Sequence, residues 1–80
     1  RPTAVFDVAK GRAVSKAEAL ERFHDRFKYP HTCKSLAARY RITIDAMSDI
    51  WNGRAELTPQ MLRDAGLRMA WVYVEEQPPD

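Results

Sequence analysis

The chain has 80 residues, of which 45% are hydrophobic and 30% charged, and its formal net charge is +2. This length allows one domain with a small core, and the composition excludes a wholly disordered chain. No run approaches eighteen apolar residues and no charged segment precedes an apolar one, so neither a transmembrane span nor a secretory signal is predicted. Because the chain starts at Arg1 rather than at methionine, a trimmed or excised piece is one interpretation.

Positive charge is concentrated in the first two thirds of the chain. Residues 1–54 carry eleven Lys or Arg against six Asp or Glu, a balance of +5, whereas residues 55–80 carry two against five, a balance of −3. Such an excess suits a surface that binds a polyanion, although it also serves solubility. Cys33 is the single cysteine and cannot form an intramolecular disulfide, so we expect a reducing compartment, by default the cytoplasm.

The first 14 residues predict an extended arm or a short strand followed by a turn, because apolar residues alternate near the middle and Gly11 interrupts any helix. Arg1, Lys10 and Arg12 make this segment basic. It can therefore lie along a phosphate backbone or in a minor groove, and a frayed terminus is the alternative.

A first helix is predicted from Ser15 to about Lys28. Ser15 and Glu18 have the spacing of a capping box, in which each side chain bonds the backbone N–H of the other residue. Pro30 disfavours helical backbone at Tyr29 and so ends the helix. Apolar residues recur at spacings of three, three and four, which forms one stripe: Ala17, Leu20, Phe23 and Phe27.

Residues 32–54 predict two short helices joined by a tight turn. The first covers about 34–40 with Thr32 as its N-cap, and the second covers about 44–51 with Thr43 as its N-cap. In the turn, a left-handed Arg41 would cost about 1 kcal/mol relative to the glycine common there. The inward faces of these helices predict core packing rather than base stacking: Leu36, Ala37, Tyr40, Met47, Ile50 and Trp51.

After the second of these helices, Gly53 suits a left-handed residue past the helix end. Thr58 and Pro59 then start a fourth helix, which Gly66 ends. Residues 67–75 change to an alternating pattern rich in β-branched and aromatic side chains, which predicts a strand. A lone strand must pair, and the candidates are residues 4–8 of the same chain and the same strand of a second copy.

These elements predict a mainly α fold, a compact bundle of four short helices that contains a helix-turn-helix, with a C-terminal β-strand. The expected divisions are an arm or short strand at 1–14, a helix-turn-helix domain at 15–67, a strand at 68–76 and a tail at 77–80. The strand is expected to pair with a sheet or with a second copy.

No residue pattern predicts catalysis or a metal. His24, His31 and Cys33 are of metal-binding types, but a structural zinc site needs four ligands at paired spacings and the chain has one thiol. The three glycines stand far apart, so no phosphate loop is present, and no geometry links Cys33 to a general base. We therefore expect neither an enzyme nor a cofactor.

Residues 33–67 carry a further pattern: a small alanine in one helix, a polar start to the next, an aliphatic pair, an Asn-Gly-basic turn and another short helix. The matching residues are Ala37, Thr43, Met47, Ile50, Asn52, Gly53 and Arg54. In this pattern the chain resembles the helix-turn-helix of the phage repressor and Cro-like family of DNA-binding proteins. The trailing strand is similar to that of Cro-type proteins, which dimerise through strands.

This resemblance implies a small transcriptional regulator of the repressor type, a homodimer with helix 44–51 in the major groove of double-stranded DNA. Carried onto this chain, the base-reading positions are Ile44, Asp45, Ala46, Ser48 and Asp49. The phosphate-binding positions are Thr32, Cys33, Lys34, Arg39, Arg41, Thr43, Asn52 and Arg54.

The base-reading positions depart from the family, whose members usually carry Gln, Asn, Ser, Arg or Lys there. A carboxylate can accept from cytosine N4 and an aliphatic group can touch a thymine methyl, but carboxylates also repel phosphates. Asp45 also suits the dipole of the helix start, and Asp49 needs a partner such as Arg54 or Arg39. The alternative function is a protein-interaction module on the same scaffold, part of a larger protein or assembly.

Overall fold

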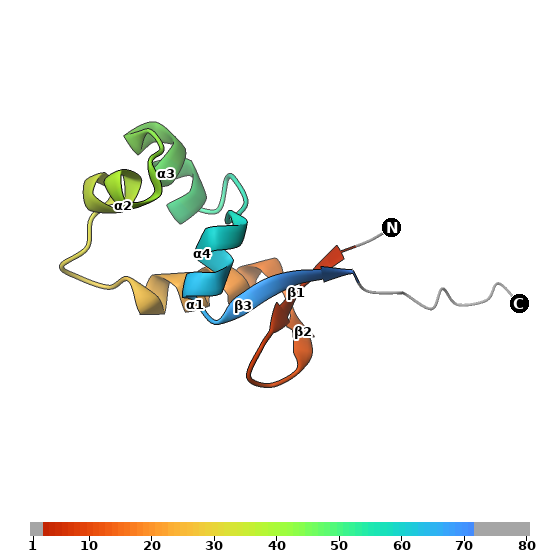
Figure 1. Ribbon diagram of the computed structural model, residues 1–80. Helices are drawn as coiled ribbons and strands as arrows, with labels where there is room; N and C mark the ends of the chain where they lie inside the picture. The colour runs from red at the N-terminus through yellow and green to blue at the C-terminus, as the bar shows by residue number, and fades with distance from the viewer. Residues whose placement is uncertain (1–2, 72–80) are drawn as a thin grey trace, which may run out of the picture.

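The computed structural model describes residues 3–71, which form four helices and a three-stranded antiparallel sheet. Figure 1 shows α2 and α3 together at one end and the sheet at the other, with α1 and α4 between them. The four helices and the strand after them confirm the prediction, but the mainly α class is wrong because three strands form a sheet. The elements are β1 Thr3–Asp7, β2 Arg12–Val14, α1 Lys16–Arg26, α2 Cys33–Tyr40, α3 Ile44–Trp51, α4 Pro59–Asp64 and β3 Leu67–Trp71.

The sheet has β1 at its centre, with β2 and β3 as its two edges. Val5 of β1 lies opposite Val14 of β2 on one side and Met69 of β3 on the other. Between the two candidate partners of the C-terminal strand, the structure selects β1 of the same chain. The predicted continuation of this strand beyond residue 71 lies outside the described residues.

Helix α1 begins as predicted, because the Ser15 hydroxyl accepts from the Glu18 N–H at 3.0 Å. The reciprocal half of the predicted capping box is replaced, since the Glu18 carboxylate accepts from Arg22 Nη2 at 3.0 Å. The predicted stripe is also corrected at one position: Ala17 is exposed and Ala19 is buried. Helix α1 packs against the sheet as well as against the other helices. Because it contacts both, its buried side differs from the side that the stripe predicts.

Helices α2 and α3 are both capped by threonines. Thr32 and Ser35 form a full capping box, with N···O distances of 2.9 and 3.1 Å, and the Thr43 hydroxyl accepts from the Ala46 N–H at 3.0 Å. Arg41 adopts the left-handed conformation that the turn predicts, with φ 59° and ψ 45°. Gly53, after α3, has φ 82° and confirms the predicted helix end.

The core consists of two clusters that α1 joins. The larger cluster packs the helices together and contains Phe23, Phe27, Leu36, Ala37, Met47, Ile50 and Met61. The smaller cluster lies between α1, α4 and the sheet and contains Ala19, Leu62 and Leu67. Tyr40 and Trp51 pack against the larger cluster, which confirms their predicted packing role. This larger cluster therefore holds α2 and α3 against the rest of the domain.

Candidate functional site

The outer face of α3 lies opposite the buried side chains of Met47 and Ile50. Ile44 is 50% exposed and Asp45 is exposed at the start of the helix. Asp49, one turn after Asp45, has 51% of its side chain exposed. The other two predicted base-reading residues, Ala46 and Ser48, are half-buried. The first turn of α3 is therefore the most accessible part of the predicted reading surface.

Ser48 and Asn52 bond to each other near the end of α3. The Asn52 amide nitrogen lies 2.9 Å from the Ser48 carbonyl oxygen and 3.3 Å from its hydroxyl oxygen. The Ser48 carbonyl also accepts from the backbone N–H of Asn52 at 3.0 Å, so the side-chain amide adds a second bond to the same carbonyl. Asn52 thus has a structural role in ending α3, alongside its predicted place near phosphate.

Asp49 binds Arg54 across the loop that follows α3. Arg54 Nε lies 3.0 Å from Asp49 Oδ1, and the Arg54 backbone N–H donates to the Asp49 carbonyl at 2.7 Å. This pairing confirms the prediction that Asp49 needs a cationic partner. Because both side chains are more than half exposed, the ion pair adds little stability and a phosphate can compete for Arg54.

Arg39 and Tyr40 both contact Asp64 of α4. Arg39 Nε lies 3.7 Å from Asp64 Oδ2, and the Tyr40 hydroxyl donates a hydrogen bond to the same oxygen. Burial, reinforced by the bond to Asp64, raises the pKa of Tyr40 to about 12. The Arg39 guanidinium also lies 5.1 Å from the centre of the Phe27 ring. Arg39 therefore links α2 to α4 in addition to any outward role, and spacing along the sequence gave no signal for this contact.

Lys34 and Arg41 are exposed cations of α2 and the following turn, as is Arg39. Within residues 3–71, neither Lys34 nor Arg41 forms an ion pair with a carboxylate. The remaining predicted phosphate-binding residues serve the fold locally: Thr32 and Thr43 cap their helices, and Cys33 is half-buried against the core. Lys34 and Arg41 are thus the cations most available to an anionic partner.

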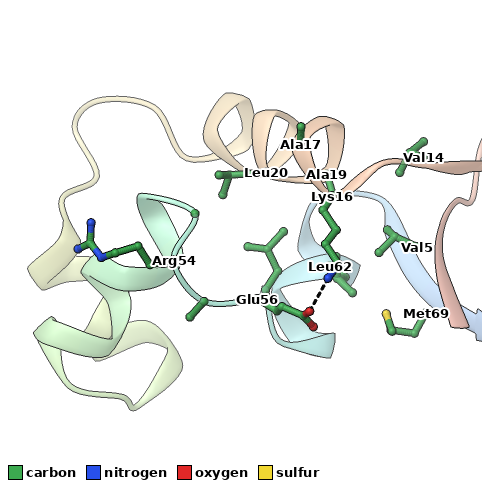
Figure 2. Close-up of a pocket in the computed structure, with 13 residues that line it drawn as sticks. Val5, Val14, Lys16, Ala17, Ala19, Leu20, Arg54, Glu56, Leu62 and Met69 are labelled. Carbon is green, nitrogen blue, oxygen red and sulfur yellow. Dashed lines mark hydrogen bonds and ion pairs between the residues drawn. The ribbon is translucent and has the colours of Figure 1, made fainter. Parts of the chain in front are cut away.

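A groove that the sequence did not predict lies between α1, the 53–57 linker and the sheet (Figure 2). Its volume is about 660 Å³ and its apolar lining includes Val5, Val14, Leu20, Leu57 and Met69. Lys16 Nζ and Glu56 Oε2 form an exposed ion pair of 2.7 Å at this groove. The alternation in β3 places Met69 here, but the sequence gives no signal for the hollow itself.

The residues considered as metal ligands are placed in structural roles. His24 Nε2 lies 2.8 Å from the Trp51 carbonyl oxygen, and the two rings have centres 4.1 Å apart. The centres of the His31 and Phe27 rings lie 5.2 Å apart, and the two rings are nearly perpendicular. In the described part of the chain, no three His, Cys, Asp or Glu side chains are grouped to hold a metal ion.

Comparison of the chain with protein-family models, curated proteins and solved structures gives no match. None of the helices in residues 3–71 has the length and apolar character needed to cross a membrane.

Proposed function

We propose that α2 and α3 form a helix-turn-helix and that the domain binds double-stranded DNA sequence-specifically as a small transcriptional regulator. The observation that carries this proposal is the pairing of two capped helices of eight residues each around a left-handed Arg41. The small Ala37 is buried at 3% exposure, which lets the following helix approach α2 closely. The resemblance of residues 33–67 to the repressor and Cro-like family supports the same function.

In this proposal α3 enters the major groove, where its outer face meets the edges of the bases. Lys34 and Arg41 hold phosphates on the side of α2, and Arg54 does so at the far end of α3. Phosphate contacts of this kind supply affinity and set the register of the protein, whereas contacts with the bases supply specificity.

The first test is titration of the domain with mixed-sequence duplex DNA at low salt, followed by titrations at rising salt. Each cation that contacts a phosphate contributes about 0.9 to the slope of log K against log salt. Lys34→Ala and Arg41→Ala should each weaken binding to every sequence and lower that slope. The structure folds residues 3–14 of the predicted basic arm into the β1–β2 hairpin, which lies away from α3 (Figure 1), so Lys10→Ala is the matched control. Absence of binding at roughly tens of micromolar protein would contradict the proposal.

We also propose that the regulator is a homodimer that pairs through β3. The sheet order leaves β3 at an edge, with one row of backbone groups not bonded to β1. An open edge is a ready site for a strand of a second copy. Sedimentation at several protein concentrations tests this, and a monomer at every concentration would contradict it.

A second candidate function is a protein-interaction module on the same scaffold, within a larger protein or assembly. It is favoured by the outward-facing carboxylates of Asp45 and Asp49, which repel a phosphate backbone. The DNA titration separates the two functions. Salt-sensitive binding that depends on Lys34 and Arg41 supports the regulator, and its absence favours the module.

A further inference from the structure

The outer stripe of α3 has one acceptor that the chain itself does not use. Helical spacing places Asp45, Ser48, Asp49 and Asn52 along this stripe. Ser48 bonds Asn52, and Asp49 pairs with Arg54. No hydrogen bond or ion pair within residues 3–71 engages the Asp45 carboxylate, which is exposed. On this stripe of α3, Asp45 is therefore the one carboxylate without a partner within residues 3–71.

An ionised carboxylate can only accept hydrogen bonds. In the major groove the donors are the amino groups of cytosine N4 and adenine N6, whereas guanine and thymine offer acceptors. The adenine amino group is flanked on both sides by acceptors, its own N7 and thymine O4. The cytosine amino group has such a neighbour on one side only, guanine O6. The carboxylate of Asp45 is therefore repelled least at cytosine.

Ile44 stands beside Asp45 at the start of α3 and is 50% exposed. An exposed aliphatic side chain gains little from polar base edges, and the thymine methyl is the apolar group that the major groove presents. Ala46, the next residue, is half-buried, so Ile44 is the apolar side chain of this turn that reaches furthest outward.

We propose that Asp45 and Ile44 determine the sequence specificity of this domain, and that its target carries a cytosine contacted by Asp45 beside a thymine contacted by Ile44. Asp49 acts as a positioning residue that holds Arg54, rather than as a base-reading residue. This inference rests on the proposed DNA-binding function and narrows its five candidate base-reading positions to two.

The negative charge of Asp45 has a second consequence. It repels phosphates wherever the domain lies on DNA, and the cytosine amino group offsets that repulsion only at the correct site. Removing the charge should therefore tighten binding to random DNA while it weakens discrimination between sites. A residue with a purely structural role would not produce these opposite changes.

The experiment selects bound duplexes from a random pool with the wild-type domain, and then titrates the selected site and its single-base variants. The wild type should prefer cytosine at one position of the site by about tenfold over the other bases. Asp45→Asn should move that preference to adenine, which a side-chain amide can bond at N6 and N7 together. Ile44→Ala should lose the preference for the neighbouring thymine, and Asp45→Ala should bind random DNA more tightly than the wild type.

Two control variants separate the possible outcomes. Glu56→Gln removes an exposed carboxylate at the groove and should leave base preference unchanged. Asp49→Asn removes a carboxylate that repels phosphates and leaves Arg54 free to bind one, so it should tighten binding to all sites alike. If the wild type binds duplexes without preferring cytosine, or if Asp49→Asn rather than Asp45→Asn changes the preferred base, the inference is overturned while DNA binding stands. If no duplex binds, the proposed function and the inference both fail.

Discussion

Arg22 Nη2 lies 2.6 Å from Asp7 Oδ2 and joins α1 to the end of β1, fifteen positions earlier in the chain. The other oxygen of the Asp7 carboxylate accepts from the backbone N–H groups of Ala9 and Lys10, at 3.0 and 3.1 Å. Asp7 is only 2% exposed, and these bonds satisfy it. One carboxylate therefore shapes the turn of the β1–β2 hairpin and attaches that hairpin to the helices.

The Asp7–Arg22 contact predicts a loss of stability in acid. The hydrogen bond from Arg22, followed by that from the Lys10 N–H, lowers the pKa of Asp7. As pH falls, Asp7 therefore binds a proton in the unfolded chain before it does so in the folded chain. The stabilisation that its charge provides is complete above about pH 4, the pKa of Asp in the unfolded chain, and is lost as pH falls through the lower pKa of the folded state. Asp7→Asn should lower the midpoint of urea unfolding at pH 7, and the difference from the wild-type midpoint should narrow as pH falls below about 4.

Glu18→Gln is a useful control for that measurement. It removes the charge on the other side of Arg22, 3.0 Å away, but keeps the contact with Asp7. Its acid unfolding should still follow the wild-type curve closely. A constant gap between Asp7→Asn and the wild type at every pH would show that Asp7 does not titrate as described.

The Tyr40–Asp64 hydrogen bond predicts a loss of stability in base. Tyr40→Phe should lower the free energy of unfolding by about 1 kcal/mol at pH 7, because Asp64 loses a donor from a half-buried site. With a folded pKa of about 12, Tyr40 keeps its proton after the unfolded phenol, at about 10, has lost it. The contribution is therefore full below pH 10 and lost as pH approaches 12, which urea unfolding at pH 8 to 12 would reveal. Equal pH dependence in both proteins would contradict it.

The left-handed backbone at Arg41 predicts that a glycine there would stabilise the domain. This conformation is disfavoured for any residue with a Cβ atom, so Arg41→Gly should raise the free energy of unfolding by up to about 1 kcal/mol. Arg41→Ala retains the strain and should give no such gain. Both substitutions remove the same cation, so both should weaken DNA binding. Chemical denaturation measured beside DNA titration separates these two effects.

The N-cap hydroxyl of Thr43 at the start of α3 predicts a loss of stability when it is removed. This hydroxyl accepts from the Ala46 N–H, and Thr43→Ala should destabilise the domain by about 1 kcal/mol, whereas Thr43→Ser keeps the acceptor and should be nearly neutral. Thermal unfolding of the two variants provides the measurement. A serine variant as unstable as the alanine variant would show that the methyl group, rather than the cap, stabilises this turn.

The features that sequence alone determined are local ones. The four N-caps, Ser15, Thr32, Thr43 and Thr58, each accept from a backbone N–H three residues ahead, so neighbouring residues suffice to predict them. The left-handed Arg41 and the pairing of Asp49 with Arg54, five positions apart, are of the same kind. Such interactions need no information about the rest of the fold.

Tertiary structure alone decided which distant segments meet. Strand β2 has three residues, too few to show an alternating pattern, and is a strand because β1 bonds to it. The packing of separate elements likewise decides that Ala19 is buried in place of Ala17. It also decides that Arg39 and Tyr40 contact Asp64. These contacts form because the burial of a common apolar core brings distant segments together. The spacing of residues along the chain does not reveal which segments will meet.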